Sequence, residues 1–378
     1  MKRRLRSLLL ISISLCFTTC FFEKKMGMNL ISSETFDTII DDQEVKLYTL
    51  KNKWGVTAQI TNYGGRVVSL WLPDKTGHFE DVVLGFNDMD TYQKSKEKYF
   101  GALIGRYGNR IAKGRFVLED STYLLVKNNG ENHLHGGDKG FESVVWKVNS
   151  FTENKLFLSY FSPHMEEGYP GNLTVSVEYQ LTDENELSIQ YFAQSDQTTI
   201  INLTHHSFFN LKGAGNGNVN DHLLQINADY FTPIDAQLIP TGVIQKVVNT
   251  PFDFLLPTQI GSRIDALDDQ LTYGHGYDHN YVLNPSDSLV SFAARVVEPV
   301  SKRTLEVYTN EPGMQFYGGN FLDGTVKGKK DKNYEHRGAF CLETQHFPDS
   351  PNKIQFPSTS LAAEEPYYSI CIYKFGLL

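Results

Sequence analysis

Cysteine is scarce in this chain of 378 residues, which contains four. Cys16 and Cys20 fall near the N-terminus, so only Cys341 and Cys371 belong to the rest of the sequence. Both lie in apolar runs, where cysteine often acts as a small buried hydrophobe; a disulfide between them stays an open alternative. No CxxC pair occurs, which argues against a structural zinc site.

Several catalytic signatures are also missing. The chain has no GxxxxGK[ST] loop, so nucleotide binding is not indicated. It has no GxSxG and no HExxH, the patterns of an α/β-hydrolase serine and of a zinc protease. Basic charge is in deficit, with 35 Lys and Arg against 44 Asp and Glu and a net charge of −9. A chain without a basic stripe is a poor nucleic-acid binder, and we expect a small neutral ligand instead.

No apolar run near the N-terminus is long enough for a comfortable membrane span. A basic start, Met1–Arg6, precedes the apolar residues 8–19, and Cys20 follows. This order resembles a bacterial lipoprotein signal, although Thr19 stands where a smaller residue is usual. We predict a lipoprotein-type signal peptide at 1–19, lipidation of Cys20 and a tether at 20–32. The protein would then be exported, either periplasmic or anchored to the outer membrane; simple secretion and a retained anchor are the alternatives.

Strand patterning dominates the remaining sequence. The clearest case is residues 172–193, where Leu, Val, Tyr and Ile alternate with polar residues on both sides of a turn at 182–185. Period-two alternation on both arms predicts a half-buried antiparallel hairpin. Further strands are expected at 56–61, 66–72, 156–161, 291–296, 304–308 and 369–375. No long helical period, repeat or linker is evident, so residues 33–378 are predicted to form one all-β domain, a large antiparallel sandwich.

Strand alternation also separates two adjacent histidines, His205 and His206. If residues 201–210 are extended, one face carries Asn202, Thr204, His206, Phe208 and Asn210, and the other carries Ile201, Leu203, His205, Ser207 and Phe209. The first face is polar and suits a ligand cleft, whereas the second suits the core. His206 is therefore the better functional candidate, with a plain hydrogen-bonding role as the alternative.

Glu343 is the one carboxylate in the apolar run 338–345. Glutamate is rarely buried unless it is paired or functional. Partial burial would raise its pKa and suit it to act as a general base; a solvent-exposed strand end is the equal alternative. His275 and His279 flank Asp278, but Gly274 and Gly276 oppose the helix that would align them as ligands. We therefore predict no metal site.

Many short runs, in order, resemble the aldose 1-epimerase (galactose mutarotase) family. They are Asn62–Gly65, Asp81–Phe86, Tyr99–Ala102, Asn109–Gly114, Leu134–Gly137, Glu167–Gly171, Asn202–Ser207, Asp278–Asn280, Glu311–Tyr317 and Cys341–Gln345. The resemblance implies a large antiparallel β-sandwich and interconversion of the anomers of free aldoses such as glucose or galactose, with no cofactor. One departure is His205, where relatives often carry Asn; it could alter the rim of the cleft.

The resemblance also implies residue roles. Glu343 would be the base and His206 the acid, while Arg110, Asn109, His135, Asp278 and Gln315 would contact the sugar. The expected partner is a free monosaccharide, and the protein would be a monomer or dimer. Two other functions remain open: a glycoside hydrolase using Glu343 and Asp278 as its carboxylate pair, and a non-catalytic sugar-binding protein. A hexose-6-phosphate epimerase would need a basic cluster for phosphate, and none is evident.

Overall fold

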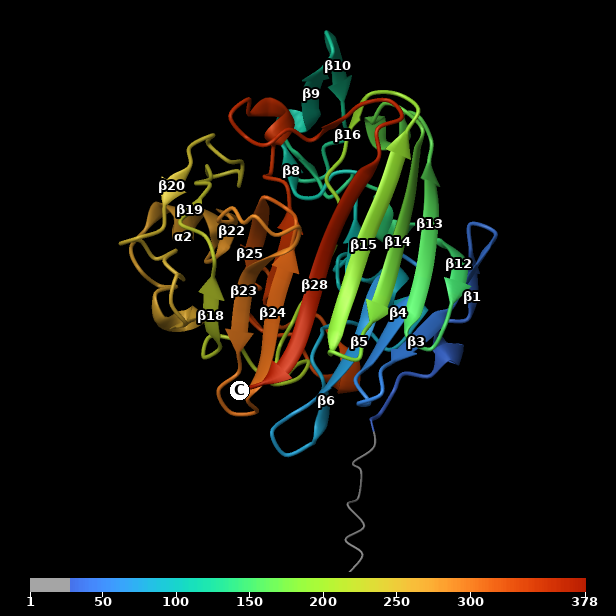
Figure 1. Cartoon of the computed structure of the whole chain (residues 1–378), viewed down its shortest axis with the longest axis vertical. Helices are drawn as coiled ribbons and strands as arrows, with labels where there is room; N and C mark the ends of the chain where they lie inside the picture. The colour runs from blue at the N-terminus through green and yellow to red at the C-terminus, as the bar shows by residue number, and fades with distance from the viewer. Residues whose placement is uncertain (1–27) are drawn as a thin grey trace, which may run out of the picture.

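The computed structural model describes residues 28–378, which form antiparallel sheets joined by long loops (Figure 1). The predicted signal peptide, Cys20 and most of the predicted tether lie outside the described residues. The end of that tether packs on the folded body: the Ile31 N–H donates to Gln59 Oε1, and the Ile31 carbonyl accepts from Gln59 Nε2, both at 2.9 Å.

The largest sheet has nine strands in the order β12-β13-β14-β15-β28-β24-β23-β18-β21. Their bounds are Lys147–Phe151, Lys155–Ser162, Leu173–Leu181, Glu186–Ser195, Tyr367–Leu377, Arg303–Thr309, Ser291–Val297, Leu223–Ile226 and Thr258–Gln259. The predicted hairpin at 172–193 is confirmed as β14 and β15, which pair from Leu173↔Ser195 to Leu181↔Leu187. All the other predicted strands are present, within one or two residues at each end.

Two smaller sheets complete the framework. One has five strands: β20 (Gln245–Lys246), β19 (Tyr230–Phe231), β22 (Asp278–Val282), β25 (Gly313–Tyr317) and β26 (Cys341–Gln345). The other has four: β3 (Leu47–Lys51), β4 (Thr57–Thr61), β5 (Arg66–Pro73) and β6 (Phe79–Asp81). Two-stranded ribbons pair β1 (Thr38–Ile40) with β2 (Gln43–Val45), β7 (Ala102–Ile104) with β17 (Thr204–His206), β8 (Arg110–Ile111) with β11 (His133–Leu134), β9 (Arg115–Leu118) with β10 (Ser121–Leu124), and β16 (Thr199–Ile200) with β27 (Ser360–Leu361).

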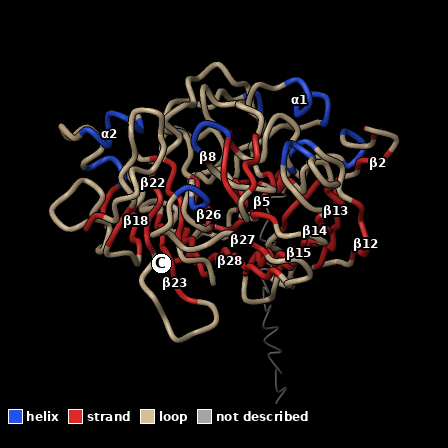
Figure 2. Tube along the Cα trace, turned by 90° about the horizontal axis from the view of Figure 1, so that it is seen from above, coloured by secondary structure: helices blue, strands red, loops and turns tan. Residues whose placement is uncertain are grey.

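The nine-stranded sheet forms one curved layer, and the strands β5, β22 and β26 lie in a second layer against it (Figure 2). Along β14 the alternate residues from Leu173 to Leu181 are fully buried. They join a single apolar cluster that includes Leu70 of the four-stranded sheet and Phe316 and Leu342 of the five-stranded sheet. The side-chain period of two therefore turns one face of each sheet into the shared core, and the predicted all-β sandwich is confirmed.

The helices are short, as the absence of a long helical period predicts. α1 (Met89–Lys94) begins at Asp88, whose side chain accepts from the Thr91 N–H. α2 (Asp269–Gly274) begins at Asp268, whose side chain accepts from the Gln270 N–H, and ends at His275 in the left-handed region (φ 55°). Within residues 28–378, no helix combines the length and the apolar character that crossing a bilayer requires.

The two cysteines of the folded body are both buried and unbonded, so the disulfide alternative is excluded. Cys341 lies in β26 and Cys371 in β28, where each acts as a core residue.

A buried ion pair fastens the loop between β25 and β26 to the four-stranded sheet. Lys329 Nζ donates to Asp81 Oδ2 and, at 2.7 Å, to the Val68 carbonyl. Asp81 Oδ1 accepts from the backbone N–H of Leu70 and of Val83. Both side chains of the pair are only 4% exposed. Removing the cation would leave a buried carboxylate without its counter-charge, which is costly.

We expect Lys329→Met to lower the free energy of unfolding by about 3–5 kcal/mol, the usual cost of breaking a buried pair from one side. The matched control is Lys330→Met, since Lys330 pairs with Glu80 and its side chain is 38% exposed. Exposed pairs contribute about 1 kcal/mol or less. Urea denaturation measures both; equal losses in the two variants would contradict the assignment.

Candidate active site

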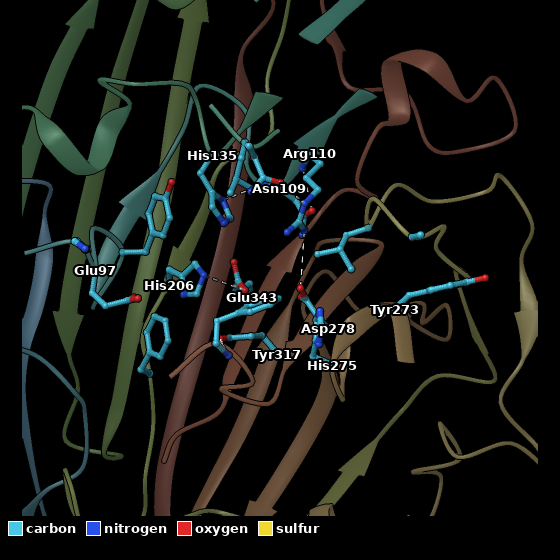
Figure 3. A pocket seen from close by; sticks show the side chains of 18 residues that line it. Glu97, Asn109, Arg110, His135, His206, Tyr273, His275, Asp278, Tyr317 and Glu343 are labelled. Atoms are coloured by element: carbon cyan, nitrogen blue, oxygen red, sulfur yellow. Dashed lines mark hydrogen bonds and ion pairs between the residues drawn. The ribbon is translucent and has the colours of Figure 1, made fainter. Parts of the chain in front are cut away.

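One cavity of about 380 Å³ opens beside the five-stranded sheet and gathers most of the residues that the sequence singled out (Figure 3). Its lining residues are Lys96, Glu97, Tyr99, Asn109, Arg110, Asn129, Leu134, His135, His206, Phe208, Ala236, Leu238, Tyr273, His275, Asp278, Tyr317, Phe321 and Glu343. A cavity of this size, with apolar walls and a few convergent polar groups, fits a small polar ligand.

Glu343 and His206 face each other across this cavity (Figure 3). Glu343 lies inside β26 and His206 at the end of β17, and His206 Nε2 is 3.6 Å from Glu343 Oε1. The two residues are 1% and 5% exposed, so Glu343 is not the solvent-exposed strand end that the sequence left open. Glu343 Oε2 and His206 Nδ1 have no hydrogen-bond partner in the described part of the chain.

Burial moves the two groups in opposite directions. It raises the pKa of Glu343 well above the ordinary value of a carboxyl; the negative charge of Asp278 raises it further, while Arg110 lowers it in part. Burial lowers the pKa of His206 to about 3. Both shifts favour the form of the pair in which the proton is on Glu343 and His206 is neutral. The carboxylate–imidazolium pair contains the same number of protons, so one transfer interconverts the two forms.

Aromatic rings surround the imidazole of His206. Tyr99 stacks on it with ring centroids 5.8 Å apart and planes 16° apart, and Phe208 stacks on it at 4.8 Å and 14°. Tyr317 meets the ring edge-on. The Gly101 N–H donates to the His206 carbonyl at 3.0 Å, which ties the segment carrying Tyr99 to β17. These contacts leave the ring little freedom to turn away from Glu343.

His135 has its tautomer fixed by the backbone. The Asn109 N–H donates to His135 Nδ1 at 3.1 Å, so in the neutral ring Nε2 carries the proton and can only donate. Burial lowers the pKa of His135 well below its ordinary value, and the charge of Arg110, with that of His206 whenever His206 is protonated, lowers it further, which favours the neutral ring.

That tautomer bears on metal binding. Ligand atoms of His135, His206 and Glu343 lie within 4.8 Å of one another. A metal at Nε2 of His135 would require the proton to sit on Nδ1, where it would oppose the Asn109 N–H. The donor set therefore does not fit a metal ion well.

Asp278 and Arg110 form the far side of the cavity. Arg110 Nη1 lies 3.9 Å from Asp278 Oδ2, and Arg110 Nε donates to Asn129 Oδ1 at 3.1 Å. Gln315 does not line the cavity; its Nε2 donates to Asp278 Oδ1 at 2.7 Å. Burial raises the pKa of Asp278, and Arg110 and the Gln315 hydrogen bond act against this rise. Gln315 thus orients an acceptor that faces the ligand space.

Some positions that the sequence analysis considered lie in the core and not in the cavity. His205 is buried between Tyr179 and Tyr373, with ring centroids 6.0 and 6.2 Å away. It faces the core, as strand alternation predicted, and the expectation that it alters the cleft rim is wrong. Of the polar face drawn for residues 201–210, Asn202 and Asn210 do not reach the cavity: their side chains donate to backbone carbonyls, including those of His346 and Gly338.

Sequence reasoning missed the aromatic walls and one carboxylate. Tyr99 and Tyr317 occur in runs used for the family resemblance, and Phe208 shares the alternating face of His206, so a signal for these three existed. Glu97 lies in an irregular segment, where no pattern marks it.

An antiparallel β-sandwich that carries a buried carboxylate–imidazole pair in a polar cavity defines an acid–base enzyme for small polyhydroxylated ligands. The family model described as aldose 1-epimerase matches residues 46–374. Galactose mutarotase of Bos taurus is 46% identical over 318 residues, which cover 84% of this chain and 90% of the relative. Aldose 1-epimerase of Escherichia coli (strain K12) is 36% identical over 337 residues, covering 89% and 96%.

The solved structures agree with the sequences. An aldose epimerase homologue from C. elegans superposes with a TM-score of 0.82 at 30% identity, covering 88% of this chain and 99% of that one. The chain belongs to the aldose 1-epimerase family. It is a carbohydrate isomerase, as predicted.

The protonated state of Glu343 has a measurable effect on stability. Its folded-state pKa lies above the ordinary 4.5. Its contribution to stability is therefore complete below about pH 4.5 and is lost as pH rises through the folded-state pKa. Glutamine does not titrate, so we expect the Tm of Glu343→Gln relative to wild type to increase between pH 4.5 and 8, by roughly a few degrees.

Scanning calorimetry or fluorimetry at several pH values measures this difference. Glu184→Gln, at an exposed turn position, is the control and should follow wild type at every pH. A difference between Glu343→Gln and wild type that does not change with pH would mean that Glu343 is ionised in the folded protein.

Proposed function

We propose that Glu343 is the general base and His206 the general acid of the epimerisation. Glu343, as the carboxylate, removes the proton from the anomeric hydroxyl of a pyranose, and His206, as the imidazolium, donates a proton to the ring oxygen. The C1–O5 bond breaks and the open-chain aldehyde forms. Rotation about C1–C2 and closure with the protons moving in reverse give the other anomer.

The observation that carries this proposal is the pair itself: two buried groups 3.6 Å apart whose pKa values are displaced in opposite directions. The form with a protonated Glu343 and a neutral His206 is also the form that the mechanism requires while the aldehyde is bound. The reaction therefore moves one proton back and forth within the pair and leaves the total unchanged. In the complex, the anomeric oxygen would lie against Glu343 and the ring oxygen against His206.

The other cavity groups suit a neutral aldose. His135 Nε2 and the Arg110 guanidinium donate hydrogen bonds, Asp278 accepts them, and the backbone and side chain of Asn109 hold the segment between them. The apolar faces of Tyr99 and Phe208 can pack against ring carbons. We propose free aldohexoses as substrates, and the relatives named galactose mutarotase support galactose among them.

We expect Glu343→Gln and His206→Gln each to lower kcat by roughly 10²- to 10⁴-fold, the usual contribution of a general acid or base. The double variant should be little worse than either single variant, because the two groups act as a unit. His336→Gln, at an exposed histidine, is the matched control. Polarimetry on freshly dissolved α-glucose and α-galactose follows the reaction.

Two results would contradict parts of this proposal. If the wild-type protein accelerates no free aldose, the activity fails. If Glu343→Gln keeps the wild-type rate, the activity stands and the assignment of the base fails.

We further propose that the enzyme is an exported lipoprotein anchored through Cys20, and that it works as a monomer or dimer. The support is the order of basic residues, apolar residues 8–19 and cysteine at the N-terminus. In a Gram-negative host fed labelled palmitate, the full chain should take up label and sediment with membranes. Cys20→Ser should lose both properties. Unlabelled wild-type protein in the soluble periplasm would favour ordinary secretion instead.

A further inference from the structure

Glu97 is a carboxylate of the cavity that the proposed chemistry does not use. It lies in the extended segment that follows α1, where its N–H donates to Ser95 Oγ at 3.0 Å. Glu97 and Tyr99, two residues apart, both line the cavity. The segment is also bonded to His206, because the Gly101 N–H donates to the His206 carbonyl. The position of Glu97 relative to His206 is thus set by the backbone.

The carboxylate of Glu97 is partly buried and has no counter-charge in the described part of the chain. Within residues 28–378 no side chain forms an ion pair or hydrogen bond with it, and burial, followed by repulsion from Asp323, raises its pKa. Its negative charge also raises the pKa of Tyr99 and of Tyr317, which form the adjacent walls. An unpaired, partly desolvated charge exerts a stronger field than a solvated one.

Figure 3 places Glu97 on the His206 side of the cavity, away from Asp278 and Arg110. If His206 protonates the ring oxygen, as the proposed function holds, then C5 and its exocyclic carbon lie on this side too, because the ring oxygen is bonded to C5. That carbon carries CH₂OH in a neutral hexose, a carboxylate in a uronic acid and a phosphate ester in a 6-phosphate. In that orientation Glu97 would face this substituent.

One cation competes with Glu97 at the rim. Lys96 also lines the cavity, but it is exposed to solvent and its charge acts on Asp323, whose pKa it helps to lower. The next cation, Lys98, acts on Glu142. Water screens an exposed ammonium more strongly than a half-buried carboxylate. Arg110 acts on Tyr99 as well, but it lies beside Asp278 on the far side of the cavity, so Glu97 is the carboxylate that lines the His206 side.

We propose that Glu97 is a specificity-determining residue that excludes aldoses with a negative charge on the exocyclic carbon, namely uronic acids and 6-phosphates, and admits those with a neutral hydroxymethyl group. The inference rests on the proposed role of His206 and adds to it a reason for substrate choice. A hydroxymethyl group can donate a hydrogen bond to Glu97, whereas a second anion can only repel it.

The test compares kcat/KM for galactose and for sodium galacturonate, with anomer exchange followed by NMR and the uncatalysed rate subtracted. Wild type should prefer galactose strongly. Glu97→Gln removes the charge with little change in shape and should reduce the ratio of the two constants by roughly tenfold or more. Glu97→Lys should reduce it further. Asp323→Asn removes an exposed carboxylate that does not line the cavity and should change the ratio far less than Glu97→Gln does.

The possible failures are distinct. If wild type accelerates neither sugar, the proposed function fails and the inference fails with it. If wild type accelerates galactose but the ratio is the same in Glu97→Gln, only the role of Glu97 is overturned. If Asp323→Asn changes the ratio as much as Glu97→Gln does, the discrimination belongs to the general charge of the rim and not to Glu97.

Discussion

The withdrawal of Glu343 and His206 from water is the constraint on which the site depends. In water, a glutamate carboxyl group loses its proton at about pH 4.3 and an imidazolium at about pH 6.5, each independently of the other. Here burial raises the pKa of one group and lowers that of the other. Glu343 then keeps its proton to a higher pH than a carboxyl group in water does, and His206 stays neutral to a lower pH than a free imidazole does. An enzyme that catalyses a reaction in both directions by proton transfer needs one group that can accept a proton and one that can donate it.

The fold supplies this withdrawal by bringing strands from distant parts of the chain together. β17 and β26 are separated by about 135 residues in sequence, yet β17 packs beside β26 at the cavity floor. In the five-stranded sheet, Gln315 on β25 is the register partner of Glu343 on β26. Its amide reaches Asp278 on the neighbouring β22. Glu343 and Asp278 are thus fixed to each other through three adjacent strands.

Much of this arrangement could be predicted from the sequence, because polar and apolar residues alternate with a period of two along the strands. This alternation located the β14–β15 hairpin and separated His206 from His205, because a strand allows only two side-chain directions. The same rule overestimated the polar face of residues 201–210, since it cannot tell a ligand-binding amide from Asn202 or Asn210, which satisfy backbone carbonyls. Glu343 was undecided because burial at a strand end depends on tertiary packing.

The side-chain directions in irregular segments could not be predicted from the sequence. The physical reason also affects which positions of the cavity can be substituted without disturbing the strands. Side-chain direction in the 95–99 segment depends on single hydrogen bonds, such as the one from the Glu97 N–H to Ser95 Oγ, and not on a repeating geometry. The segment is nonetheless fastened to β17 at Gly101, whose φ of 66° and close approach to the Val67 carbonyl leave no room for a Cβ. A substitution at position 97 can therefore change the field on the sugar without moving the strands that hold the proton pair. In the proposed mechanism, the acid–base pair is therefore held by strands of the sheets, and the residue proposed to select the substrate is held by a loop that is anchored to them.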